Sequence, residues 1–145
     1  MITPGEPVVL DTTIWIFGLR RQPGIPSCAQ VIDRLAELHV VLPRQVLREL
    51  QVNLSEGEAR SLFRLLKSLP KPVVFDWHRA NPGVIRKYTA LGCKLGDAAL
   101  AAHLEDLAIG VLVTENRHFL TEIKDLPFRR LTSAELLAEL PEPSP

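Results

Sequence analysis

The chain has 145 residues, 46% of them hydrophobic and 23% charged, which is enough to bury one globular core and excludes an intrinsically disordered chain. Its 17 basic and 17 acidic residues give a formal net charge of zero, which excludes binding of nucleic acid by bulk charge but permits a local basic rim. No apolar run approaches the ~20 residues that cross a bilayer, no targeting segment is recognisable, and Cys28 and Cys93 lie far apart, so we expect a reduced cytoplasmic protein without membrane contact.

The N-terminal half of the chain predicts strands and helices in alternation. The first strand, 8–10, ends on Asp11, and either threonine after it can cap the helix that follows. Ser27 is expected to cap the second helix, whose apolar positions continue to Leu38. The other elements expected here are a strand at 39–42, a helix from 43 to 54 and a helix from 59 to 69.

A buried helix and a buried strand dominate the C-terminal half. The helix carries Asp97 in its first turn, where a negative charge suits the helix dipole, and Gly110 ends it before the all-apolar strand 111–113. A polar turn follows that strand. The other elements expected here are a strand at 73–75, a helix from 81 to 91, a fifth strand near Phe128 and a last helix from 133 to 140.

Short apolar strands that alternate with helices are typical of a parallel sheet covered by helices. The sequence therefore predicts an α/β fold in a single domain, 1–140, followed by a disordered tail, 141–145. In such a fold, each helix that follows a strand begins at the carboxyl edge of the sheet, where open α/β sheets bind ligands.

Acidic side chains from distant parts of the sequence are expected to meet at this edge. Asp11 ends the first strand, and Glu49 lies in the second turn of the helix after the second strand. The helix of Asp97 leads down to the fourth strand, so it begins at the same edge, and Glu115 and Asn116 directly follow that strand. Each has a plain structural alternative: Asp11 as a helix cap, Glu49 as a solvated helix residue, Asp97 as a first-turn charge, Asn116 as a turn residue.

Carboxylates held together repel one another and raise each other's pKa unless a cation lies between them. Oxygen ligands without a histidine or cysteine pattern favour a hard ion, Mg²⁺ or Mn²⁺. An ion of this kind lowers the pKa of a bound water and assists hydrolysis of a phosphodiester. The predicted cluster is therefore a candidate site for metal-dependent cleavage of nucleic acid.

Four segments together resemble a PIN-domain ribonuclease, and most closely the VapC-type toxins of bacterial and archaeal toxin–antitoxin pairs. They are Asp11-Thr12-Thr13 after a short strand, Glu49 within "VLREL", Gly96-Asp97 with its alanine-rich helix, and "VLVTENRHF" at 111–119. The resemblance covers nearly the whole chain. It implies a five-stranded parallel sheet between helices, an endoribonuclease that uses Mg²⁺ or Mn²⁺, an RNA substrate, a cognate antitoxin protein and a homodimer.

The resemblance also implies roles for individual residues. The acidic set that holds the metal is Asp11, Glu49 and Asp97, and Asn116 occupies the catalytic position usually held by a fourth acidic residue, which is a departure because an amide lends no charge. We expect Thr12 and Thr114 to orient this set, Glu115 to be a possible extra ligand, and Lys94 and Arg117 to contact the substrate by their proximity. The apolar run 14–17 and the apolar face of 46–54 are either core or a dimer surface.

Three other functions remain open at this stage. A PIN nuclease of RNA maturation without an antitoxin, or a PIN interaction module without catalysis, would carry the same fold. A phosphatase of the HAD type would use Asp11 as nucleophile, but that family needs a second aspartate where this chain has Thr13.

Overall fold

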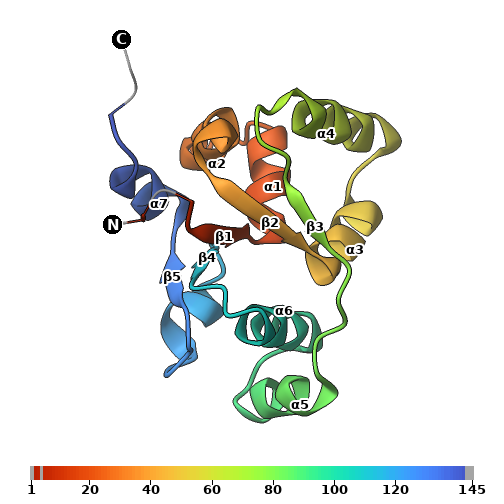
Figure 1. The fold of residues 1–145 in the computed structure, drawn as a ribbon, viewed down its shortest axis with the longest axis vertical. Coiled ribbons are helices and arrows are strands. Elements are labelled where there is room, and N and C mark those ends of the chain that lie inside the picture. Colours follow the sequence, from red (N-terminus) through yellow and green to blue (C-terminus); the bar gives the residue numbers. More distant parts are fainter. Residues whose placement is uncertain (1, 4, 143–145) are drawn as a thin grey trace.

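The computed structural model describes residues 2–3 and 5–142, which form a five-stranded parallel sheet with helices on both faces (Figure 1). The strand order in the sheet is β3-β2-β1-β4-β5, and every neighbouring pair runs parallel. This is the α/β, PIN-like fold that the sequence predicted, which is thereby confirmed. The strands are β1 (Pro7–Leu10), β2 (His39–Pro43), β3 (Val74–Asp76), β4 (Val111–Val113) and β5 (Arg129–Leu131).

Helices α1 and α2 pack against each other on one side of the sheet, and α5 and α6 pack together on the other (Figure 1). Helix α3 contacts both α1 and α6, and α7 packs on α2 and β5. The helices are α1 (Thr12–Leu19), α2 (Pro26–Asp33), α3 (Arg44–Asn53), α4 (Glu56–Ser68), α5 (Pro82–Ala90), α6 (Leu95–Asp106) and α7 (Ser133–Glu139), with a short 3₁₀ turn at Leu35–Glu37 and a π turn at His118–Glu122.

The two central strands explain why the sequence reads as continuous apolar runs. All three residues of β4 and the last three of β1 have no exposed surface, because helices cover both faces of a parallel sheet. Trp15, Tyr88 and Phe119 are the largest of the fully buried side chains. Burying a side chain of this size contributes roughly 1.5–3 kcal/mol to folding.

The structure corrects three details of the sequence reading. Asp11, not a threonine, caps α1, since its side chain accepts from the Thr12 amide. Ser27 does not cap α2: that helix begins at Pro26 without a side-chain cap, and the Ser27 hydroxyl lies 2.6 Å from the Ser133 hydroxyl. The helix expected to reach Leu38 ends at Asp33, and a 3₁₀ turn completes the apolar pattern.

The two apolar segments considered for a dimer surface lie mostly in the core. Ile14 and Trp15 have no exposed surface, and Val46, Leu47 and Leu50 are buried. These residues therefore stabilise the core, whereas Ile16 and Phe17 of the first segment remain partly exposed.

Within the described ranges, no helix is both long enough and apolar enough to span a bilayer. Pro141 and Glu142 belong to no helix or strand, and the rest of the expected tail, 143–145, lies outside the described residues.

Close contact between α1 and α2 depends on Gly18. A Cβ built at this position would lie 2.3 Å from the Ile32 Cγ1 and 2.7 Å from the Cys28 carbonyl oxygen, which is backbone and cannot rotate away. The two helices therefore meet at a distance that only glycine allows.

We predict that Gly18→Ala destabilises the protein by about 2 kcal/mol in denaturant unfolding, because the added methyl group forces α1 and α2 apart. Gly24→Ala is the matched control, since a Cβ there meets nothing within 4 Å, and it should change stability by no more than about 0.5 kcal/mol. Equal stability of the two variants would contradict this account of the α1–α2 contact.

Candidate active site

The carboxyl edge of the sheet has its topological switch point between β1 and β4. The chain builds β1, β2 and β3 in one direction and then returns to place β4 on the other side of β1. Helices that leave these two neighbouring strands diverge, and ligands of open α/β sheets bind in the crevice between them. Leu10 pairs with Val113 in the register, so the next residues of the two strands, Asp11 and Thr114, lie side by side at this point.

Asp11 is held at the switch point by its backbone and by both carboxylate oxygens. Its amide donates to the Val113 carbonyl at 2.8 Å. Its Oδ1 accepts from the Thr12 amide and its Oδ2 from the Thr114 hydroxyl, each at 2.8 Å. The side chain is only 7% exposed and receives no ion pair from a basic residue in the described part of the chain.

Glu49 reaches the same edge from α3. Its Oε2 accepts from the Thr12 hydroxyl at 2.6 Å, and its Oε1 accepts from the Gln45 amide at 2.8 Å. Thr12 therefore bonds to Asp11 through its backbone and to Glu49 through its side chain. The start of α6 comes close at this point, since a Cβ on Gly96 would lie 3.2 Å from both the Gln45 Nε2 and the Glu49 Oε1.

Asp97 completes the group from the first turn of α6. Its Oδ2 accepts from the Asn116 side-chain amide at 3.2 Å. The Asn116 backbone amide donates to the Thr114 hydroxyl at 3.0 Å, and that hydroxyl in turn donates to Asp11. Hydrogen bonds thus join the three carboxylates in one series through Thr12, Thr114 and Asn116.

These side chains line an open hollow of about 400 Å³. Ile16 and Phe17 of α1 line it as well, together with Glu115 and Asn116 after β4. The hollow therefore combines carboxylates with apolar side chains.

Burial and mutual repulsion disfavour the charged forms of the carboxyl groups on the floor of this hollow. The pKa of Asp11 is raised to about 6: burial is the largest cause and the charges of Glu49 and Asp97 add to it, while hydrogen bonds from Thr114 and Thr12 act in the opposite direction. Burial also raises the pKa of Asp97, with Glu49 adding to it, while the amide of Asn116 and the charges of His118 and Lys94 act in the opposite direction. A cation in the hollow would relieve this repulsion.

The donor set suits a hard divalent ion that keeps part of its water shell. Carboxylate oxygens are the ligands that Mg²⁺ and Mn²⁺ prefer, and none of the described histidines and cysteines joins the carboxylates there. Within the described residues, no three acidic, histidine or cysteine side chains are grouped so that they alone could hold a metal ion. Mg²⁺ commonly binds through one or two carboxylates, water and substrate phosphate, and the oxygens of Asp11 and Asp97 fit that pattern.

Glu115 lies on the rim of the hollow but is turned toward α7. Its Oε1 accepts from the Ser133 amide at 2.8 Å and from the Ser133 hydroxyl at 2.5 Å, so it satisfies the first N–H of that helix, which has no partner within the helix. Lys94 is the exposed N-cap residue of α6, and Arg117 is exposed directly after Asn116; neither is among the residues that line the hollow.

Sequence reasoning missed three side chains that shape this site. Gln45 lies one helical turn before Glu49, a spacing that predicts contact but does not reveal which partner matters. Ser133 binds Glu115 across 18 positions of the chain. The His118 Nε2 donates to the Gly92 carbonyl at 2.9 Å and its Nδ1 contacts Glu122; Glu122 and then the Gly92 carbonyl raise the pKa of His118, which favours a positive charge near Asp97. No sequence pattern indicates the contact of Ser133 with Glu115 or of His118 with Gly92.

The raised pKa of Asp11 predicts a pH-dependent loss of stability. The folded protein binds the proton more tightly than the unfolded chain, so the stabilisation is complete below pH 3.8 and is lost as the pH rises through about 6. This shift corresponds to about 3 kcal/mol. Asparagine keeps the cap on α1 and removes the charge.

We therefore predict that Asp11→Asn is more stable than wild type by about 3 kcal/mol in chelator at pH 8 and that the gain disappears near pH 4, measured by urea unfolding. Asp125→Asn removes a carboxylate from an exposed position and serves as the control for altered net charge. An Asp11→Asn variant less stable than wild type at pH 8 would refute the electrostatic account of the hollow.

Two solved structures match nearly the whole chain. A chain in the crystal structure of VapBC2 from Rickettsia felis, bound to a DNA fragment from their promoter, matches with a TM-score of 0.60 and 20% identity over 87% of this chain and 98% of that one. A chain in the crystal structure of FitAcB from Neisseria gonorrhoeae matches with a TM-score of 0.59 and 13% identity over 88% of this chain and 98% of that one. No protein-family model matches the sequence, and no curated protein does. At these identities the similarity establishes the fold: the chain has the architecture of a chain in each of these two structures.

Proposed function

We propose that the protein is an endoribonuclease that hydrolyses RNA phosphodiesters with Mg²⁺ or Mn²⁺. The observation that carries the proposal is the series of hydrogen bonds that holds Asp11, Glu49 and Asp97 together at the switch point of the sheet. Three carboxylates arranged in this way repel one another in the metal-free protein, and a bound metal ion would offset that repulsion. The resemblance of the sequence to PIN-domain ribonucleases and the shared fold support the same activity.

The residues of the hollow have separate tasks in this mechanism. When bound, the ion supplies positive charge that activates a water molecule and stabilises the charge that develops on the phosphate. Asp11 and Asp97 hold it, and Glu49 contributes its charge from the side of α3. Thr12 and Thr114 fix the orientation of these carboxylates, and the Asn116 amide fixes Asp97.

Basic side chains next to the site in sequence would position the substrate. Lys94 and Arg117 are exposed, close in sequence to Asp97 and Asn116, and would contact phosphates that flank the bond to be cleaved. The apolar wall of Ile16 and Phe17 gives a surface against which an unpaired base can pack. Single-stranded RNA would satisfy both features.

The protein would be the toxin of a VapBC-type pair, restrained by an antitoxin protein and working as a homodimer in the cytoplasm. The resemblance of the sequence to VapC-type toxins implies these partners, and the fold shared with a chain of the VapBC2 structure supports the same assignment. A neighbouring gene for a small DNA-binding protein, together with a stable complex of the two products, would distinguish this role from a PIN nuclease of RNA maturation.

We predict that cleavage of total RNA requires Mg²⁺ or Mn²⁺ and falls by at least about 100-fold in Asp97→Asn, because charge stabilisation by a bound ion contributes several kcal/mol to the transition state. Mapped cleavage sites on total RNA, with a chelator control, measure this effect. Asp125→Asn should cleave like wild type. Cleavage that persists in chelator, or in Asp97→Asn, would rule out the proposed mechanism.

Among the four expected catalytic residues, Asn116 is the one that is not acidic, and its replacement tests whether that position faces the ion. Asn116→Asp exchanges the amide that lies 3.2 Å from Asp97 for a fourth carboxylate. We predict a lower melting temperature than wild type in chelator and a larger rise on addition of Mn²⁺, because like charges at this distance repel until a cation lies between them. A variant that melts like wild type in both conditions would show that position 116 does not face the ion.

A further inference from the structure

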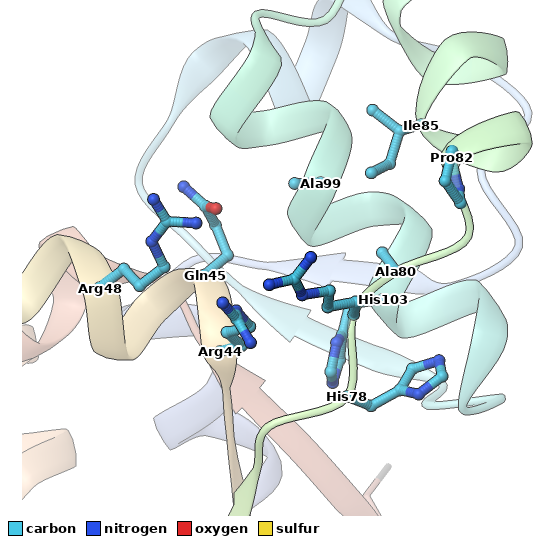
Figure 2. Close-up of a pocket in the computed structure, with 10 residues that line it drawn as sticks. Arg44, Gln45, Arg48, His78, Ala80, Pro82, Ile85, Ala99 and His103 are labelled. Carbon is cyan, nitrogen blue, oxygen red and sulfur yellow. The ribbon is translucent and has the colours of Figure 1, made fainter.

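A second hollow, of about 350 Å³, lies between α3 and the α5–α6 pair, outside the carboxylate site (Figure 2). Figure 2 shows Arg44, Gln45 and Arg48 projecting into it from α3, with His103 of α6 and Pro82 of α5 across from them. Arg79, from the loop before α5, also lines it. We refer to this hollow as the arginine pocket.

The arginine pocket concentrates positive charge that the protein does not neutralise. Within the described part of the chain, the guanidinium groups of Arg44, Arg48 and Arg79 form no hydrogen bond or ion pair. No acidic residue is among those that line the pocket. Arginines elsewhere behave differently: Arg20 pairs with Glu58 at 2.8 Å and Arg21 with Asp33 at 3.0 Å. In a chain of zero net charge, three neighbouring unpaired guanidinium groups are a local anion-attracting feature.

The helices add to this potential. Arg44 is the first residue of α3, where the helix dipole disfavours a cation, and no side chain caps the free N–H groups of that first turn. An anion at this position would be attracted by the guanidinium groups and by the helix terminus together. Arg44 is therefore placed where it weakens the free helix and strengthens an anion site.

One residue that lines the arginine pocket also has a buried polar atom without a hydrogen-bond partner among the described residues. His103 is 2% exposed, and its Nε2 has no hydrogen-bond partner; the Asp76 Oδ1 lies 3.9 Å away, beyond hydrogen-bonding distance. Buried polar atoms are nearly always satisfied, so a polar ligand in the pocket would supply the contact that the protein itself lacks.

The arginine pocket is continuous with the carboxylate hollow. A third hollow between α3 and the start of α6 shares Glu49 and Asn53 with the carboxylate site and shares Gln45, Arg48 and Ala99 with the arginine pocket. Along α3, Arg44 and Glu49 are five residues apart, which corresponds to about 7.5 Å of helix rise. A single strand that lies along this face can therefore reach both.

Resting on the proposed function, we infer that the arginine pocket binds a backbone phosphate of the RNA substrate, one that is separate from the phosphate being cleaved. Arg44, Arg48 and Arg79 hold this phosphate and fix the direction in which the strand crosses the carboxylates. Contacts of this kind position a strand without reading its bases. The arginine pocket thus increases affinity for RNA and sets the position of the strand, and the carboxylate site cleaves the phosphodiester.

The test measures binding in the absence of cleavage. Anisotropy of a short dye-labelled single-stranded RNA is titrated in chelator at several salt concentrations with wild type, with Arg44→Gln/Arg79→Gln and with Arg60→Gln/Arg64→Gln. The second double variant removes two exposed, unpaired arginines from α4 and is matched in charge. Within the described residues, neither pair makes a side-chain hydrogen bond or an ion pair, and equal melting temperatures of the two variants would confirm that both are folded.

We expect Arg44→Gln/Arg79→Gln to weaken RNA binding at least about tenfold and, because one phosphate contact is lost, to reduce the slope of log K against log salt by about 0.7, while the α4 variant changes affinity by less than about twofold. Equal losses in both variants, or no RNA binding by wild type, would overturn the inference. So would displacement of the labelled RNA by a 5′-mononucleotide as readily as by unlabelled RNA, since the pocket would then be a nucleotide site. Because binding is read without catalysis, an inactive but RNA-binding protein would refute the nuclease proposal and leave this one standing.

Discussion

The hydrogen bonds that join Asp11, Glu49 and Asp97 are the constraint on which the rest of the molecule depends. They connect the end of β1, the second turn of α3 and the first turn of α6, and each link passes through a neutral group, Thr12, Thr114 or Asn116. Neutral donors orient carboxylates without cancelling their charge. The hollow therefore stays negative, and the burial that raises the pKa of Asp11 is balanced by packing elsewhere in the fold.

The backbone makes this arrangement rigid. The registers of β1 with β4 set Asp11 next to Thr114, and the close approach of α6 at Gly96 sets Asp97 against the Gln45–Glu49 pair. Sites built on the ends of buried strands and helices are held more accurately than sites on long loops. Because the carboxylates are held close together, we expect the metal-free protein to be less stable at neutral pH, which is the usual trade-off between stability and function.

Zero net charge conceals a strong separation of charge along one face. Carboxylates line the hollow at the switch point, and unpaired arginines line the pocket at the start of α3. Gln45 and Arg48 belong both to this pocket and to the third hollow that connects it with the carboxylates. An acidic hollow alone would repel a polyanion; a cation in it and a basic pocket beside it reverse that effect for a strand that spans both. Whole-chain composition cannot reveal such a separation, because opposite charges cancel in the sum.

The sequence by itself determined the order of the elements and the edge at which Asp11, Glu49, Asp97 and Asn116 gather. Apolar runs of strand length fix the parallel sheet, and the position of each residue relative to its strand fixes the edge, so both follow from local pattern and chain connectivity. Only the tertiary structure decided which polar groups pair. The Thr12 hydroxyl donates to Glu49, 37 positions away, and Glu115 accepts from Ser133 at the start of α7. The unpaired arginines of α3 likewise become visible only when α5 and α6 close the opposite wall. Such contacts depend on distances between side chains of separate elements, which packing of the whole core sets and which no local pattern encodes.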